Sequence, residues 1–284
     1  MQVLITGAGG QLGTELVAVF SAAGHDVIAA TRDRLDVSDR DQAVGAITAL
    51  CPDAVVHTAA WTAVDDCEAD PDRAWRVNAL GSRHVADGCR RVSAHLCAVS
   101  TDYVFDGTSS APYTEWDRTG AINVYGRSKE AGEREVLGLV PGATVVRTSW
   151  LAGAGGSNFV RTMLRLAEGG GEVRVVDDQR GCPSFAHDVA EGLLRLVSAR
   201  LPGLYHMTNQ EPTTWWGLAR ATFALAGADE ERVIPISTAE LQPARPARRP
   251  ANAVLDNAAL RLAGLPLLPD HHDALARLVK ELRG

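Results

Sequence analysis

The stretch TGAGGQLG, residues 6–13, constrains the fold more than any other part of the chain. It lies between a short apolar run and a segment of helical periodicity, and glycine recurs in it at Gly7, Gly10 and Gly13. Such a turn lets the backbone approach a pyrophosphate, and the helix start offers unpaired N–H groups to the anion. Glycine spacing alone also fits an ordinary strand–helix turn. Because the stretch belongs to the first strand–helix unit, we favour a dinucleotide-binding turn.

Short apolar runs alternate with longer helical patterns through residues 1–150. This alternation predicts an α/β protein, and apolar strands without a two-residue period fit a sheet covered on both faces. We therefore expect a Rossmann-like, doubly wound parallel sheet. The expected strands are 2–8, 25–31, 53–59, 94–101 and 142–149, and the expected helices are 11–24, 40–51, 71–92 and 125–139.

Glycine and proline become frequent after residue 150, and strands become sparse. We interpret residues 1–150 as the dinucleotide-binding domain, and expect 172–208 to return to its sheet. Residues 151–171 and 209–284 should form a smaller C-terminal region. Trp215 and Trp216 open an expected helix there, and we interpret at least one of them as a core residue.

Charge and cysteine content argue against several classes of function. A net charge of −7 disfavours nucleic acid or an anionic membrane as the partner. No apolar stretch approaches the roughly 20 residues that cross a bilayer. The five cysteines are scattered and lack a CxxC pair, so we expect reduced thiols in a cytoplasmic protein. We expect no metal site, since His271 and His272 have no metal-like context.

The end of the second expected strand bears on the choice of cofactor. An NAD-binding fold usually has an acidic residue there, whereas this chain has Arg32, whose guanidinium could pair with the 2′-phosphate of NADP. A solvated surface arginine is the alternative. Asp36 and Val37 follow and could flank the adenine. We expect NADPH as the cofactor, with NADH as the alternative.

Tyr125 and Lys129 stand four residues apart in an expected helix, and therefore share one face of it. A free tyrosine has a pKa of about 10, which a neighbouring ammonium lowers. The pair could then protonate a carbonyl oxygen, while the lysine also holds the nicotinamide ribose. Thr101 ends an expected strand, where ligands of parallel sheets bind, so its hydroxyl could bond the same oxygen. Each feature alone is common by chance.

Together, these features resemble the extended, nucleotide-sugar-modifying branch of the short-chain dehydrogenase/reductase superfamily. Segments over nearly the whole chain are similar to successive motifs of the dTDP-4-dehydrorhamnose reductase family. They are GGQLG, AAWTAVDDCE, VNA, STDYVFDG, NVYGRSK, VVRTSWL, VVDDQRGCP and RPANAVLDN. The resemblance implies NADPH-dependent reduction of the 4-keto group of dTDP-4-dehydro-L-rhamnose, giving dTDP-L-rhamnose. It also implies that the C-terminal region binds the nucleotide sugar.

The same resemblance implies roles for individual residues. Thr101, Tyr125 and Lys129 would be catalytic, with Tyr125 the proton donor. The remaining residues divide into a cofactor set, Gly10, Gln11, Leu12, Asp36, Val37, Ala59 and Ala60, and a set that touches the sugar or its base, Val64, Asp102 and Trp150.

Two further assignments are left open. Arg249, within RPARRP, could bind the substrate diphosphate through its guanidinium fork, and a solvated proline-rich linker is the alternative. Members of the family sometimes hold Mg²⁺ at a dimer contact, where Glu15 and Glu191 would be the counterparts, but we do not commit to the ion. The chain could be a monomer or a homodimer.

The sequence also fits rival functions. Trp61, Asp66 and Ala253 depart from the family's common residues, which leaves a related dTDP-4-keto-6-deoxysugar open as the substrate. An epimerase or a 4,6-dehydratase is disfavoured, because dehydratases of this branch have Asp-Glu after the threonine and here Asp102 precedes Tyr103. A non-catalytic regulatory subunit with the reductase fold is the rival from another class.

Overall fold

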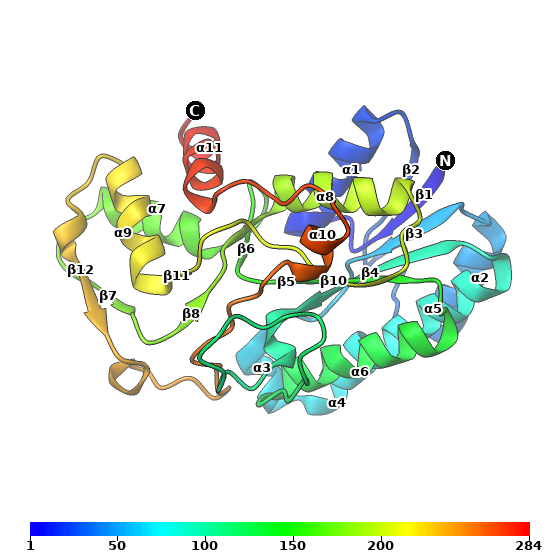
Figure 1. Ribbon diagram of the computed structural model, residues 1–284, viewed down its shortest axis with the longest axis horizontal. Coiled ribbons are helices and arrows are strands. Elements are labelled where there is room, and N and C mark those ends of the chain that lie inside the picture. Colours follow the sequence, from blue (N-terminus) through cyan, green and yellow to red (C-terminus); the bar gives the residue numbers. More distant parts are fainter.

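A six-stranded parallel sheet organises the chain, which a computed structural model describes over residues 1–284. The strands lie in the order β2-β1-β3-β4-β5-β10, and every neighbouring pair is parallel (Figure 1). The predicted Rossmann-like fold is therefore confirmed. The strands are β1 Gln2–Thr6, β2 Asp26–Ala30, β3 Ala54–His57, β4 His95–Thr101, β5 Thr144–Thr148 and β10 Gly203–His206.

Helices cover both faces of this sheet (Figure 1). On one face, Phe20 of α1 and Leu193 of α8 are buried in one apolar cluster with the strands. On the other face, Ile47 of α2, Val85 of α5 and Val136 of α6 are buried in a second cluster. The helices are α1 Gln11–Ala22, α2 Arg40–Leu50, α5 Gly81–Val92, α6 Val124–Leu139 and α8 Ala186–Ser198.

The strand order reverses next to β1. The chain passes from β1 outward to β2, and then returns to the other side of β1 to form β3. In open parallel sheets, ligands bind at the carboxyl ends of the strands where the order reverses. The glycine turn that follows β1 and the residues that follow β3 therefore meet at the predicted binding edge.

The predicted helix 71–92 is a composite. It consists of α4 (Pro71–Ala74), a π-helical segment (Trp75–Leu80) and α5, which follow one another without a break. A separate helix, α3 (Val64–Ala69), precedes it and was not predicted. Its sequence, VDDCEA, is too short and too acidic to show the apolar period of a helix.

The C-terminal region stands beside the sheet, at the left of Figure 1. Phe223 of α9 and Val233 of β12 share a small core there, and Leu275 of α11 belongs to a neighbouring one. Besides α8, the helices after residue 150 are α7 Phe159–Glu168, α9 Trp215–Leu225, α10 Ala258–Leu262 and α11 His271–Arg283. The strands there are β6 Leu151–Ala152, β7 Val173–Val176, β8 Arg180–Gly181, β9 Ser184–Phe185, β11 Thr213–Thr214 and β12 Val233–Ile236.

The placement predicted for 172–208 needs one correction. β10 does join the main sheet, beside β5, after α8 has crossed back over it. β7 does not, because it pairs with β12 in a separate two-stranded sheet. Val175 of β7 is buried against Met163 and Phe223, so α7 and α9 provide the apolar cover that a short apolar run needs.

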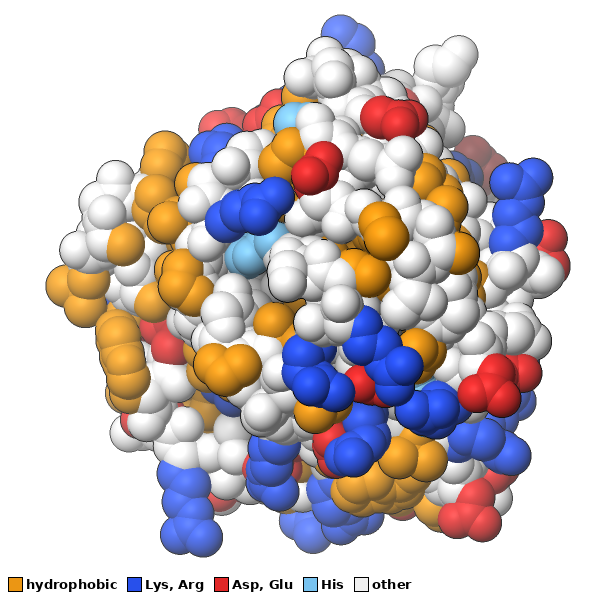
Figure 2. Space-filling view, turned by 90° about the vertical axis from the view of Figure 1, so that its right-hand side faces the viewer, with side chains coloured by type: hydrophobic (Ala, Val, Ile, Leu, Met, Phe, Trp, Pro, Cys, Tyr) orange, Lys and Arg blue, Asp and Glu red, His pale blue; other side chains and the backbone are white.

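Figure 2 looks onto the end of the molecule that carries the N-terminus, opposite the C-terminal region. Lys and Arg side chains gather over the lower part of this face, with Asp and Glu among them (Figure 2). No helix anywhere in the chain combines the length and the apolar character that a membrane span requires.

Candidate active site

A cavity of about 710 Å³ opens at the carboxyl edge of the sheet. Its wall is formed by the segments that follow β1 to β5, by α6, and by Trp215 at the start of α9. Every residue predicted to be catalytic, cofactor-binding or substrate-binding lies in this wall, with the exception of Arg249. Side chains separated by more than a hundred residues of sequence thus surround one space.

The glycine turn has the geometry that a pyrophosphate site needs. Gly7 adopts a φ of +71°, and a Cβ at this position would lie 2.7 Å from the backbone nitrogen of Ala59. A Cβ at Gly13 would lie 2.2 Å from the carbonyl oxygen of Gly7. α1 starts directly after Gly10 without a side-chain cap, so its first N–H groups remain available to an anion. The turn therefore fits the phosphates of a dinucleotide.

Gln11 joins this turn to the opposite wall. Its side-chain oxygen accepts hydrogen bonds from the backbone nitrogen of Gly153 (3.1 Å) and from Asn158 Nδ2 (3.0 Å). Its side-chain nitrogen donates to the carbonyl of Ser157 (3.2 Å). Gln11 thus lines the cavity, as predicted, but its amide holds the segment before α7 against the start of α1.

The residues predicted to surround the adenosine lie together at one end of the cavity wall. Arg32 is exposed beside the cavity, where its guanidinium is free to meet a phosphate. Asp36 accepts hydrogen bonds from the backbone nitrogen (2.9 Å) and the hydroxyl (2.7 Å) of Ser38. These bonds hold the pKa of Asp36 below its usual value. Val37, Ala59 and Ala60 complete this part of the wall.

Local packing brings Tyr125 next to Thr101. Thr101 is the last residue of β4, and Tyr125 is in the first turn of α6, whose start is capped by Asn123 Oδ1 accepting from the nitrogen of Gly126 (2.7 Å). A Cβ at Gly126 would lie 2.0 Å from the carbonyl oxygen of Tyr103. The glycine after the tyrosine is therefore required for α6 to approach the end of β4 this closely.

Burial controls the electrostatics of the catalytic pair. It raises the pKa of Tyr125, although a hydrogen bond with Thr101 acts in the opposite direction. It also lowers the pKa of Lys129 to about 8, opposed by the charge of Glu133. Lys129 Nζ donates to the carbonyl of Val99 (2.7 Å). The predicted lowering of the pKa of Tyr125 is thus wrong, because desolvation raises it by more than the Thr101 side chain lowers it.

An aromatic pair closes the far side of the cavity. Trp150 stacks on Trp215, with ring centroids 3.7 Å apart and planes 11° apart. Gly181 lies at the edge of the Trp150 ring, where a Cβ would come within 2.5 Å of it. Val64 and Asp102, also predicted to touch the sugar, line the same space. Trp215 was interpreted only as a possible core residue, and its place in this wall was missed.

Arg249 lies elsewhere. Its guanidinium donates twice to the carboxylate of Asp65, at 3.0 and 2.8 Å, and so ties the segment after β12 to α3. This pair lowers the pKa of Asp65. In this arrangement the guanidinium is paired with Asp65, and binding of the substrate diphosphate by Arg249 stays a prediction. A guanidinium group can make two parallel hydrogen bonds to a phosphate or to a carboxylate. The sequence therefore could not tell whether Arg249 binds a diphosphate or pairs with an acidic residue.

Three other wall residues were not predicted as site residues. Arg73 places its guanidinium carbon 4.3 Å from the ring centroid of Trp61, and both residues line the cavity. Tyr103 packs edge-on against Tyr125, with centroids 5.8 Å apart. Trp61 and Tyr103 stand inside the motifs AAWTAVDDCE and STDYVFDG, which could have indicated them, whereas Arg73 resembles any exposed helix arginine.

The two glutamates considered for Mg²⁺ flank a histidine on the α1–α8 face. His187 Nδ1 lies 3.3 Å from Glu15 Oε2, and His187 Nε2 lies 3.6 Å from Glu191 Oε1. All three side chains lie outside the wall of the cavity.

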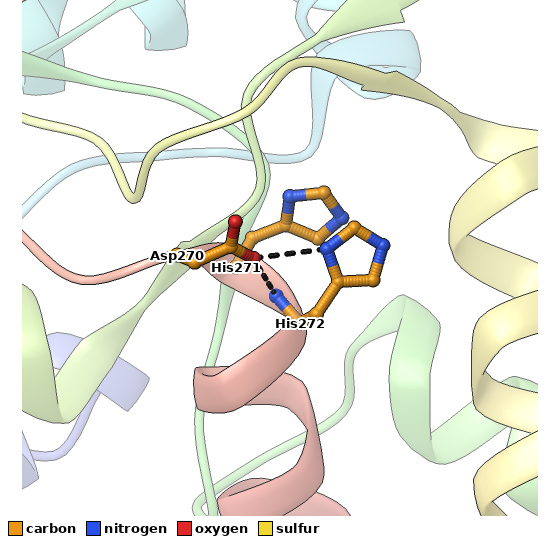
Figure 3. Close-up of side chains that lie close together, drawn as sticks. All are labelled: Asp270, His271 and His272. Carbon is orange, nitrogen blue, oxygen red and sulfur yellow. Dashed lines mark hydrogen bonds and ion pairs between the residues drawn. The ribbon is translucent and has the colours of Figure 1, made fainter.

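Asp270, His271 and His272 form a cluster at the start of α11 (Figure 3). Asp270 is the N-cap of the helix and accepts hydrogen bonds from the backbone nitrogen (2.7 Å) and Nδ1 (2.9 Å) of His272. His271 is buried, which lowers its pKa, and its Nδ1 lies 3.2 Å from the carbonyl of Gln210. Helix capping and packing account for this cluster.

The family described as RmlD substrate binding domain matches residues 1–283. A dTDP-4-dehydrorhamnose reductase of Streptomyces griseus is 46% identical, over 99% of this chain and 94% of the relative. A dTDP-4-keto-6-deoxy-D-glucose reductase of Streptomyces niveus is 44% identical, over 92% of this chain and 91% of the relative.

Among solved structures, a dTDP-4-dehydrorhamnose reductase of Bacillus anthracis in complex with NADP superposes with a TM-score of 0.95. It is 36% identical and covers 99% of each chain.

Proposed function

The chain belongs to the dTDP-4-dehydrorhamnose reductase family, and on that premise we propose that it reduces the 4-keto group of dTDP-4-dehydro-L-rhamnose with NADPH. One observation carries the proposal. The glycine turn, Arg32, and the set Thr101, Tyr125 and Lys129 line a single cavity at the point where the strand order reverses. Protein groups for phosphate, ribose and a reacting ketone are thereby available in one place.

The mechanism assigns a step to each catalytic side chain. When bound, NADPH supplies the hydride that reduces the carbonyl carbon. The hydroxyls of Thr101 and Tyr125 hold the ketone oxygen, and Tyr125 transfers its proton to this oxygen as negative charge develops there. Because burial raises its pKa, Tyr125 is fully protonated at neutral pH and ready to act as an acid. Lys129 would hold the nicotinamide ribose.

A related dTDP-4-keto-6-deoxysugar is the second candidate substrate. It is favoured by the Streptomyces niveus relative, which acts by name on a glucose-configured sugar and is nearly as similar as the rhamnose enzyme. Both reactions use the same protein groups at C4. They differ in the configuration of the ring, which the residues facing the sugar would have to distinguish.

Several properties of the molecule stay proposals. We infer a cytoplasmic location from the five cysteines, all of which are free thiols. A division into a dinucleotide-binding domain and a nucleotide-sugar region is supported by the separate small cores that contain Phe223 and Leu275. A monomer and a homodimer are the alternatives for the oligomeric state. Titration with Mg²⁺ would test whether Glu15 and Glu191 bind the ion.

A panel of dTDP-linked 4-keto-6-deoxysugars, each supplied with NADPH or NADH, tests the function. We expect consumption of NADPH with the rhamnose precursor, followed at the nicotinamide absorbance. A higher kcat/KM with the glucose-configured sugar would identify the second candidate instead. No turnover with any sugar, together with capture of a defined enzyme partner, would support the regulatory-subunit reading.

The Tyr125→Phe variant tests the proton donor. Loss of the acid should lower kcat by roughly 10²–10⁴-fold. Affinity for NADPH, measured by fluorescence titration, should change little because the phenol's partners are Thr101 and the substrate. Full activity in Tyr125→Phe would exclude this role for the phenol.

A further inference from the structure

We propose that Asp102 is a proton reservoir that recharges Tyr125 through the hydroxyl of Thr101. The proposal rests on the proposed reductase function, and extends it to the step that follows reduction. Each turnover removes one proton from Tyr125, and this proton must be replaced before the next ketone can be reduced.

The three side chains form a chain of contacts at the end of β4. Thr101 Oγ1 donates to Asp102 Oδ1 at 2.9 Å, and this hydrogen bond is buried. The Tyr125 phenol lies near the same threonine side chain, whose influence on the pKa of Tyr125 opposes that of burial. Thr101 therefore stands between a carboxyl group and the proton donor, and its hydroxyl can accept from one while it donates to the other.

The surroundings of Asp102 favour a carboxyl group that holds a proton. Asp102 is 2% exposed, and its Oδ2 has no hydrogen-bond partner. An ionised oxygen in such a place lacks the compensation that buried charge needs. Burial raises the pKa of Asp102 to about 7. This places its titration within the working range of pH.

The groups that face Asp102 carry no compensating positive charge. They are Tyr103 on its own segment, Tyr125 on α6, and Cys182 after β8. Burial raises the pKa of each, so all three are neutral near pH 7. Lys129 of α6 also lines the cavity, and burial lowers its pKa to about 8, so it titrates close to Asp102. The pH profile of the Asp102→Asn variant therefore has to separate the titration of Asp102 from that of the amine.

The proton passes from Asp102 to Tyr125 through Thr101. The Asp102 O–H bond breaks and its proton passes to Thr101 Oγ1, while the proton of Thr101 passes to the Tyr125 phenolate. The products are a carboxylate at Asp102 and a neutral phenol at Tyr125. Rotation of the carboxyl group exchanges its two oxygens, so a proton held on Oδ2 can reach Thr101. Asp102 lines the cavity, and takes a proton back from water once product leaves.

The pH profile of kcat provides the test. Asp102 holds its proton below a pH of about 7 and loses it above, so kcat of the wild type should fall as pH rises through this value. In Asp102→Asn, kcat should be lower by roughly 10- to 100-fold and should not follow this titration. Asp106→Asn is the matched control, because this nearby aspartate is only half-buried and lies outside the cavity, and it should keep the wild-type profile.

Two further measurements separate the relay from a structural role. Infrared difference spectra recorded across the pH range should show a protonated-carboxyl band in the wild type that is missing in Asp102→Asn. Thr101→Val should keep this band and yet lose the pH dependence of kcat, whereas Thr101→Ser, which retains the hydroxyl, should keep both. Any contact of Asp102 with the sugar would appear in KM.

The outcomes distinguish the two proposals. An active wild type whose kcat does not fall near neutral pH, or whose fall persists in Asp102→Asn, overturns the reservoir alone. If Asp102→Asn does not fold, persistence of the pH dependence in Thr101→Val overturns it. A wild type that consumes no NADPH with any sugar of the panel overturns the reductase function and the reservoir together.

Discussion

At the scale of single residues, the cavity combines groups whose protonation depends on burial. Tyr125 is 9% exposed and Lys129 is 6% exposed, so neither is fully solvated in either protonation state. Desolvation disfavours the phenolate and the ammonium alike. Tyr125 therefore keeps its proton until the ketone oxygen becomes basic. The neighbouring amine of Lys129 titrates near pH 8.

Arg32 is the residue expected to select the cofactor. In Arg32→Ala, the Kd for NADPH should rise by roughly tenfold or more, as loss of a charge-assisted phosphate contact implies, while the Kd for NADH changes little. Fluorescence titration with both dinucleotides measures this.

Arg34→Ala is the control for Arg32→Ala, since Arg34 is also exposed but lies outside the cavity wall. Equal weakening of NADPH and NADH in Arg32→Ala would rule out a 2′-phosphate contact.

At the scale of elements, α6 turns an unusual face toward the sheet. Tyr125, Lys129 and Glu133 recur every four residues and are all buried. Gly126 lets the helix approach the end of β4, because a Cβ there would meet the carbonyl of Tyr103, and Gly132 lets it approach the π-helical segment, where a Cβ would meet the carbonyl of Asn78. A buried face built of polar groups needs partners on the neighbouring strand.

Arg147 of β5 is the partner of Glu133. Its guanidinium makes a bidentate pair with the carboxylate, at 2.8 and 2.7 Å, and both side chains are nearly inaccessible. Glu133→Ala should lower the free energy of unfolding by about 3–5 kcal/mol, because it leaves a buried guanidinium unpaired. Urea denaturation measures the change.

Glu135→Ala provides the comparison, as this glutamate pairs with Arg83 on the surface. Its loss should cost about 1 kcal/mol or less. Similar destabilisation by the two variants would show that the buried pair contributes no more than an exposed one.

At the scale of the whole molecule, contacts across the cleft join the sheet to the C-terminal region. Trp150 stands at the end of β5 with a φ of +46°, which is strained for a bulky residue, and stacks on Trp215 of α9. Two further contacts join the sheet to the C-terminal region: Gln11 bonds to the 153–158 segment, and Arg249 pairs with Asp65.

Trp215→Ala tests whether this junction shapes the sugar site. Loss of the stack should raise the KM for the sugar by roughly 2- to 10-fold, the range that about 0.5–1.5 kcal/mol of aromatic stacking gives, with the Kd for NADPH unchanged. Steady-state kinetics and cofactor titration separate the two effects.

Trp216→Phe is the control for Trp215→Ala, since Trp216 is outside the cavity and donates to the carbonyl of Val233. An unchanged KM in Trp215→Ala would place the sugar away from the tryptophan pair.

The sequence alone determined those features of the fold and the site whose physical cause lies within a few neighbouring residues. Apolar runs and helical periods act within a few residues, and the spacing of Gly7, Gly10 and Gly13 stands within one short stretch, so the parallel sheet and its phosphate turn could be predicted. The spacing of Tyr125 and Lys129 on one helix face is likewise a local property.

Tertiary structure decided what depends on surroundings. Three outcomes depend on which distant segments come together. Arg249 pairs with Asp65, β7 pairs with β12 and not with the main sheet, and Trp215 lines the cavity. The pKa of Tyr125 belongs to the same class, because desolvation is set by all the atoms around a group, and no pair of residues in the sequence records it.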